Sequence, residues 1–272
     1  MKSTIAMRFS AAAPVYDSLA DVQRKAAGRL MALVDNCPAP KRILEVGCGT
    51  GVLTALLSRR FPSANIDAVD ISPAMIARAR HNLQENGRIN WIVSDVRGLL
   101  RAEPYDLIAS SCVLHWVTPL EPVFERLNAL LNHEGHAALA LMTSGTFAEL
   151  HASRKRIAPH KPPRVIMPAE DKVSEALFNA GMAVMIEKRE SLRQNFSSAG
   201  ELVRHLHRQG LTGGNVPSNR HALNRTELFR LIEDYDSNYR DYTGVFASYR
   251  LYCVGARKSA SPAAPFNLHQ RA

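Results

Sequence analysis

A buried strand that opens into a glycine-rich turn is the sequence feature that most constrains the fold of this chain. Residues 42–46 are mostly apolar, and Gly47, Gly49 and Gly51 follow them directly, ahead of an apolar segment with helical spacing. Glycine has no Cβ, so it adopts backbone angles with positive φ and lets a ligand approach the main chain closely. Parallel sheets covered by helices bind ligands at the carboxyl ends of their strands. The turn therefore predicts a ligand site in an α/β fold.

Alternating strand and helix patterns extend this prediction along the first half of the chain. A lead-in helix is expected at 17–34. After it, apolar spacing predicts strands at 42–46, 65–70, 89–93, 105–110 and 136–142, and helices at 51–60, 73–86 and 119–131. Such alternation is typical of a parallel sheet with helices on both faces.

The pattern changes beyond Met142. Expected elements are helices at 146–157, 170–180, 198–209 and 225–238 and strands at 182–190 and 245–256. The segments 146–168 and 191–242 are therefore predicted to form a helical cap over an α/β, mostly parallel sheet of seven strands. The expected organisation is a lead-in helix and lid at 1–40, a ligand-binding core at 41–145, cap insertions with the last strands at 146–258, and a flexible tail at 259–272.

The spacing of the glycines separates two kinds of nucleotide-binding turn. A dinucleotide fingerprint, G-x-G-x-x-G, needs its third glycine at position 52, where Val52 stands. The glycines instead read G-x-G-x-G, with Glu45 two residues ahead of the first. Asp70 ends the next expected strand about 20 residues later, where a carboxylate can accept hydrogen bonds from both ribose hydroxyls. A tight turn in another α/β protein would explain the glycines but not this carboxylate.

This glycine pattern together with Asp70 resembles motif I and the following strand of the class I methyltransferases. The resemblance implies a Rossmann-like fold and S-adenosylmethionine (SAM) as cofactor. It implies that Asp95 and Val96, after the third strand, contact adenine, and that Ser111, after the fourth, reaches the methionine end. The cofactor-binding residues expected on this basis are Tyr16, Glu45, Gly47, Gly49, Gly51, Asp70, Ile71, Met75, Asp95, Val96 and Ser111.

The N-terminal residues and four later segments carry a second, more specific pattern. The opening Phe9-Ser-Ala-Ala-Ala-Pro-Val-Tyr16-Asp17-x-x-Ala20-x-x-Gln23 resembles F-x-x-A-A-x-x-Y-D-x-x-A-x-x-Q of the malonyl-acyl carrier protein O-methyltransferases of biotin synthesis. Similar islands are His115-Trp116, residues 145–150, residues 204–210 and residues 248–250. The chain departs from this family at His115, where Gln is usual, and at His207 and Leu211, where Lys and Ala are usual.

This second resemblance implies methyl transfer from SAM to the free carboxylate of a malonyl thioester, preferably malonyl-acyl carrier protein, which starts pimeloyl and biotin synthesis. That carboxylate is ionised at neutral pH, so no strong general base is needed. We therefore expect residues that position the reacting atoms and exclude water. Tyr16 is expected to close over the cofactor, and His115 and Trp116 to pack against the sulfonium or the thioester. Ordinary core packing is the alternative for all three.

Arg204 and Tyr249 are expected to engage the malonyl carboxylate, because the planar guanidinium of arginine suits bidentate binding. A surface arginine on an amphipathic helix is the alternative for Arg204. The net charge of the chain is +9, and nearly all of the excess lies after residue 150. A basic cap would steer an acidic acyl carrier protein, unless it is a solvated face without a partner. Its expected members are Arg154, Lys155, Arg156, Lys161, Arg164, Arg204 and Arg208.

Other functions fit the sequence less well. An RNA methyltransferase needs aromatic side chains that stack on bases, and segment 151–220 has only Phe178 and Phe196. The four cysteines form no C-x-x-C pair, so no metal site or disulfide framework is expected. No nucleic acid or membrane partner is predicted, and the expected location is the cytoplasm. A methyltransferase for another small acid or quinone precursor, and a scaffold without activity, remain alternatives.

Overall fold

A computed structural model of the chain describes residues 2–35, 37–84, 87–99, 103–163, 166–211 and 222–259. Most of the tail expected at 259–272, and Arg164 of the expected basic cap, lie outside these residues. Within the described part of the chain, no helix is long and apolar enough to cross a membrane.

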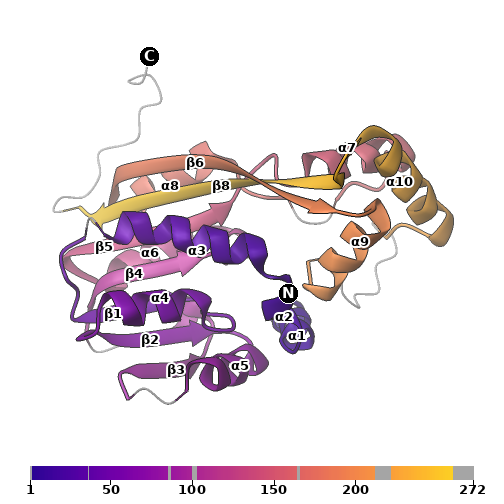
Figure 1. Ribbon diagram of the computed structural model, residues 1–272. Helices are drawn as coiled ribbons and strands as arrows, with labels where there is room; N and C mark the ends of the chain where they lie inside the picture. The colour runs from indigo at the N-terminus through magenta and orange to yellow at the C-terminus, as the bar shows by residue number, and fades with distance from the viewer. Residues whose placement is uncertain are drawn as a thin grey trace.

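One twisted sheet forms the centre of the molecule, with its strands in the order β3-β2-β1-β4-β5-β8-β6 (Figure 1). The strands are β1 (Arg42–Val46), β2 (Asn65–Asp70), β3 (Ile89–Val93), β4 (Tyr105–Ser111), β5 (Leu131–Met142), β6 (Met182–Phe196) and β8 (Gly244–Lys258). Strands β1 to β5 are parallel, and β8 lies antiparallel between β5 and β6. The expected sheet of seven mostly parallel strands is confirmed, and the two-residue β7 (Arg240–Asp241) pairs with β8 in addition.

Helices cover both faces of this sheet. The helices α3 (Asp21–Val34) and α4 (Val52–Arg60) share one buried apolar cluster with one face, and α6 (Glu121–Leu130) and α8 (Glu170–Asn179) share a second cluster with the other. Successive side chains of β1 point to opposite faces of the sheet, since Ile43 belongs to the first cluster and Leu44 to the second. A strand buried on both faces explains why 42–46 reads as a mostly apolar run.

The order of the strands determines where a ligand can bind. The chain moves outward from β1 through β2 to β3 and then returns to the other side of β1 at β4. At such a reversal, the connections that follow two neighbouring strands run to opposite faces of the sheet. This opens a crevice at the carboxyl ends of these strands. The glycine turn at 47–51 joins β1 to α4 at this point, and α5 (Pro73–Leu83) follows β2 beside it.

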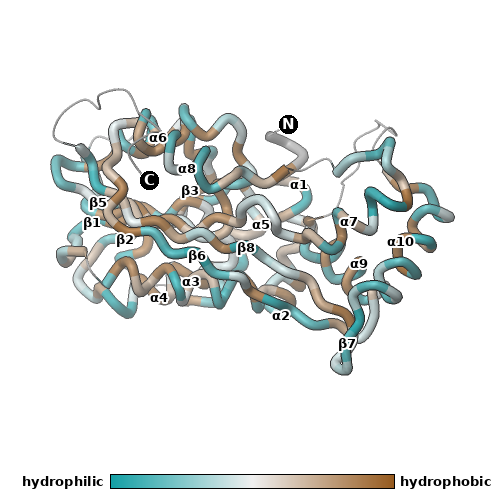
Figure 2. Tube along the Cα trace, turned by 90° about the horizontal axis from the view of Figure 1, so that it is seen from above, coloured by the Kyte–Doolittle hydropathy of each residue, from teal (hydrophilic) through white to brown (hydrophobic). Residues whose placement is uncertain are grey.

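The last two long strands extend past the rest of the sheet and carry the cap. Strand β6 was expected to end at residue 190, but it continues to Phe196, which pairs with Val245 of β8. Beyond the parallel strands this two-stranded ribbon leads to α7 (Ala148–Ile157), α9 (Ala199–Arg208) and α10 (Arg225–Asn238) (Figures 1 and 2). Residues 191–196 therefore belong to the sheet, although they were expected in the cap.

Two further differences concern the start of β5 and the N-terminal residues. Strand β5 begins at Leu131, five residues earlier than expected, and α1 (Lys2–Ala12) forms a helix that no apolar period predicted. The short α2 (Tyr16–Leu19) then leads into α3. Helix α1 lies beside α5 rather than in the layer formed by α3 and α4 (Figure 1). The N-terminal segment thus covers the carboxyl ends of the strands, where the ligand crevice lies.

Candidate active site

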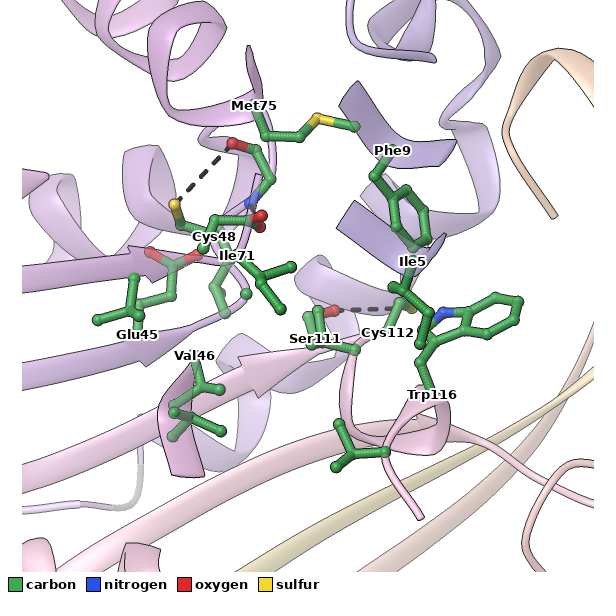
Figure 3. Close-up of a pocket in the computed structure, with 18 of the residues that line it drawn as sticks. Ile5, Phe9, Glu45, Val46, Cys48, Ile71, Met75, Ser111, Cys112 and Trp116 are labelled. Carbon is green, nitrogen blue, oxygen red and sulfur yellow. Dashed lines mark hydrogen bonds between the residues drawn. The ribbon is translucent and has the colours of Figure 1, made fainter. Parts of the chain in front are cut away.

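A cavity of about 190 Å³, larger than a cavity of about 20 Å³ next to it, lies at the carboxyl ends of β1, β2 and β4 beneath α1 and α2 (Figure 3). The residues expected to bind a cofactor all line it except Gly51. Gly51 caps α4 instead, and its φ of 92° places a would-be Cβ 2.5 Å from Leu83 Cδ1. The wall also contains residues that were not expected there, among them Ile5, Phe9, Gln23, Cys48 and Cys112.

Two glycines of the turn have different tasks. At Gly47 φ is 74°, and an added Cβ would lie 2.2 Å from Val113 Cγ2, so the turn can only pass this point without a side chain. At Gly49 φ is 53°, and an added Cβ would meet no atom within 4 Å, because the residue borders the open cavity. Gly47 is therefore required by packing, and Gly49 keeps space free for a ligand.

Asp70 connects the glycine turn to the loop after β2. Its Oδ2 accepts a hydrogen bond from the Gly49 N–H at 2.9 Å, and its Oδ1 accepts one from the Ser72 N–H at 2.8 Å. The Ser72 hydroxyl caps α5 by accepting from the Met75 N–H and lies 2.7 Å from the Ser10 hydroxyl of α1. Burial raises the pKa of Asp70 above its usual value. One carboxylate thus holds both loops that frame the cavity.

Glu45 is a buried acid on the cavity wall. Its carboxyl is almost inaccessible to solvent, and Oε2 has no hydrogen-bond partner in the described part of the chain. Burial, and to a smaller extent the nearby Asp70 carboxylate, raise the pKa of Glu45 to about 8. A buried acceptor without a partner costs free energy, which indicates that a ligand group completes this part of the site.

The raised pKa of Glu45 leads to a prediction on stability. The folded chain keeps this proton up to about pH 8, whereas the unfolded chain releases it near pH 4.5. The folded state therefore binds more protons between these values, and its free energy of unfolding falls as pH rises through this window. In thermal unfolding without ligand, we expect the gain in Tm from Glu45→Gln to grow from about pH 5 to about pH 8. Parallel curves for the two proteins would contradict this.

Aromatic side chains from the N-terminal segment close the cavity. The Phe9 ring packs edge-on against Tyr16 and Trp116, with centroid distances of 6.3 and 5.9 Å. Burial keeps the pKa of Tyr16 well above its usual value, so its hydroxyl stays protonated. Asp17 fastens the segment to α5, since its Oδ2 accepts from Arg78 Nε at 3.2 Å and from Asn82 Nδ2 at 2.9 Å.

Asp95 and Ser111 mark two other sides of the same cavity. Both oxygens of Asp95 accept from the Arg97 guanidinium, at 2.9 and 2.7 Å, and Oδ1 also accepts from the Arg97 N–H. The Ser111 hydroxyl lies 3.8 Å from the Cys112 sulfur (Figure 3). The resemblance to class I methyltransferases placed both residues at this cavity, since they lie at the carboxyl ends of β3 and β4.

A second cavity of about 20 Å³ lies between the first and the cap. Its volume holds one or two water molecules, so a larger acceptor has to displace side chains. Phe9, Tyr16, Gln23, Cys112 and Trp116 border both cavities. The remaining lining residues come from the turn after β4, the sheet and the cap, and are His115, Met142, Thr146, Phe147, Met167, Leu211 and Tyr249.

His115 and Tyr249 both line the second cavity, as their assignment to an acceptor site requires. His115 Nδ1 accepts from the Met142 N–H at 3.2 Å, and burial lowers the pKa of His115 to about 3. The imidazole is therefore neutral near pH 7 and cannot supply a positive charge. Tyr249 is buried, donates to Gln194 Oε1 at 3.2 Å and packs against Phe147 at a centroid distance of 4.8 Å.

Arg204 lies apart from these residues. It is exposed on α9 and lines neither cavity. This position favours the alternative for Arg204, a surface arginine on an amphipathic helix, over contact with the acceptor carboxylate.

Comparison with known proteins identifies the family of the chain. Residues 43–135 match a methyltransferase domain. The malonyl-acyl carrier protein O-methyltransferase of Priestia megaterium is 30% identical, over 95% of this chain and 98% of that protein. The chain belongs to the malonyl-acyl carrier protein O-methyltransferase family. The Geobacter sulfurreducens protein of this name is 31% identical over 92% of this chain and 96% of its own length.

The fold agrees with this family. A putative methyltransferase from Bacillus halodurans superposes with a TM-score of 0.63 at 14% sequence identity, and covers 87% of this chain and 100% of that chain. The expected Rossmann-like class I methyltransferase fold is thereby confirmed. In this family member the glycine turn and Asp70 frame the larger cavity, and the cap closes one side of the second cavity.

Proposed function

We propose that this protein transfers the methyl group of SAM to the free carboxylate of a malonyl thioester, preferably malonyl-acyl carrier protein, the step that starts pimeloyl and biotin synthesis. The observation that carries the proposal is the pair of cavities in a chain of this family. They meet at Tyr16, Gln23 and Trp116, so a donor on one side would face an acceptor on the other. The four cysteines are free thiols, in keeping with a reaction in the cytoplasm.

The residues around the larger cavity fit SAM. Gly49 leaves its wall open, and the unpartnered Oε2 of Glu45 suits a cationic amino group. Asp70 would hold the ribose hydroxyls, Asp95 and Val96 the adenine, and Ser111 the methionine end. SAM supplies an electrophilic methyl group on a positively charged sulfur.

The protein itself positions the reacting groups and excludes water from them. Tyr16 and Phe9 of the N-terminal segment close the site, and Trp116 offers an aromatic surface where the two cavities meet. His115 is neutral near pH 7, and an ionised carboxylate needs no base. The rate is therefore expected to depend on alignment of the oxygen with the methyl group rather than on proton transfer.

The carrier protein would dock on the cap, where four of the expected basic residues fall into two pairs of different kinds. Arg156 pairs with Asp234 at 2.6 Å and Lys161 with Glu227 at 2.7 Å, so these cations stabilise the cap internally. Arg204 and Arg208 are exposed four residues apart on α9, and side chains with this spacing share one face of a helix. We assign carrier contact to this face, because acyl carrier proteins are acidic.

The test offers labelled SAM with malonyl-acyl carrier protein, malonyl-coenzyme A, acetyl-acyl carrier protein and RNA. We expect a methyl ester on the malonyl thioesters only. Arg204→Glu/Arg208→Glu should raise KM for the malonyl carrier protein by about 10-fold and leave malonyl-coenzyme A unaffected. Arg59→Glu, an exposed reversal on α4, is the matched control. Label on acetyl thioester, or on RNA alone, would refute the proposed function.

A further inference from the structure

The second cavity has no cationic side chain to pair with a carboxylate. Among its described lining residues none is Arg, Lys, Asp or Glu, and His115 is neutral. A carboxylate that enters must therefore be held by neutral donors. The methyl group would cross where the two cavities meet, so the donors at that junction are the candidates to hold the carboxylate. Apart from the Cys112 thiol, a weak donor, the side-chain donors there are Tyr16, Gln23 and Trp116.

Gln23 differs from the other two because a second side chain fixes its orientation. Gln209 follows α9 and is 1% exposed, and its Nε2 donates to the Leu19 carbonyl and, at 3.5 Å, to Gln23 Oε1. Since a carbonyl only accepts, Gln209 must present its nitrogen to Leu19. The oxygen of Gln23 then faces Gln209, which leaves the two N–H groups of Gln23 for the cavities that it lines.

The state of Gln209 indicates that this arrangement has a cost. Its Oε1 is buried and has no hydrogen-bond partner in the described residues. A buried amide with one unsatisfied atom destabilises a fold, so a core position would favour an apolar residue of the same size. A buried glutamine at position 209 is therefore explained better by the orientation that it gives to Gln23 than by a gain in stability.

We propose that Gln23 binds the carboxylate of the acceptor, by donating an N–H to the oxygen that does not attack the methyl group, and that Gln209 is its positioning residue. The inference rests on the proposed function, which takes the acceptor to be a carboxylate. A neutral amide holds this group without withdrawing as much charge as a guanidinium would. The attacking oxygen thereby keeps its nucleophilicity, since strong ground-state binding would slow the transfer.

Four variants test this assignment: Gln23→Leu, Gln23→Glu, Gln209→Leu and the double leucine variant. We expect Gln23→Leu to lower kcat/KM for the malonyl thioester by about 10- to 100-fold, the range for a hydrogen bond to a charged group, with the Kd of SAM unchanged. Gln209→Leu should lose less, and the double variant no more than Gln23→Leu, because Gln209 acts through Gln23.

Gln23→Glu keeps the size and shape of the side chain. Near pH 8 its ionised carboxyl would repel the acceptor, and as pH falls the protonated carboxyl regains a donor. The variant should therefore recover activity toward low pH more than the wild-type protein does. A purely structural role of Gln23 would not produce this recovery.

The outcomes separate the two proposals. Wild-type protein that binds SAM but methylates no malonyl thioester would overturn the proposed function and this inference with it. Methyl transfer by the wild type, with unchanged kcat/KM in Gln23→Leu, would overturn the inference alone. Equal losses of SAM affinity and turnover would also overturn it, because they would place Gln23 against the cofactor.

Discussion

Replacement of Asp70 by alanine is expected to weaken SAM binding by at least about 100-fold. Hydrogen bonds to a charged group contribute about 1.5–3 kcal/mol each, and about 1.4 kcal/mol corresponds to a tenfold change in Kd. Asp70 is assigned to two ribose hydroxyls, and it already holds the N–H groups of Gly49 and Ser72. Asp70→Ala would remove the ligand contacts and release both loops at once.

Titration calorimetry with SAM, together with thermal unfolding, measures this loss. Asp70→Asn should lose less than Asp70→Ala, because an amide oxygen still accepts on one side. Asp67→Asn is the matched control, since Asp67 lies on the same strand, lines neither cavity and accepts from Tyr105 and Asn90 instead. If Asp70→Ala bound SAM as tightly as Asp67→Asn does, the assignment of the larger cavity to the cofactor would be wrong.

Gly47→Ala is expected to have the second large effect, on folding. A left-handed backbone costs alanine about 1–2 kcal/mol, and an overpacked site costs about 1–3 kcal/mol more. Here the added methyl group would overlap Val113, 2.2 Å away. The sum is about 2–5 kcal/mol, which should lower Tm by roughly 5–15 °C.

Gly49→Ala is the matched comparison, because its φ is also positive but nothing lies near its Cβ position. We expect a fall in Tm of only a few degrees, and a loss of SAM affinity of about 10-fold or more as the methyl group enters the cavity. Circular dichroism and calorimetry on both variants provide the check. Two variants with the same Tm would refute the separate tasks assigned to Gly47 and Gly49.

The sequence was most informative where one local segment both forms and fills the site. Strand β1, the glycine turn and Asp70 lie within 30 residues, and each has few conformations open to it. A buried strand has to be apolar, a turn beside Val113 has to be glycine, and a carboxylate that is to bind ribose has to end the neighbouring strand. Gly47, Gly49 and Asp70, which line the larger cavity, could therefore be predicted from the sequence.

The residues proposed for the acceptor side could not be predicted in this way, since they meet only in the folded chain. Gln23 and Gln209 are 186 residues apart and belong to α3 and to the end of α9. Helical spacing showed that α9 is amphipathic, but not whether Arg204 points to a cavity or to solvent. Residues 191–196 are mostly polar because the ribbon of β6 and β8 is partly exposed there, so no apolar alternation revealed the strand.

That ribbon has a consequence for how such an enzyme can evolve. Strands β6 and β8 join the sheet at its far edge, away from β1 and the glycine turn, and the cap helices are attached where these strands extend beyond the sheet. Insertions or replacements at that end leave the hydrogen bonds of β1, β2 and Asp70 untouched. Related proteins can therefore change their acceptor and keep the same methyl donor. Selection for a new substrate is then expected to change the sequence of β6, β8 and the cap helices more than that of β1 and the glycine turn.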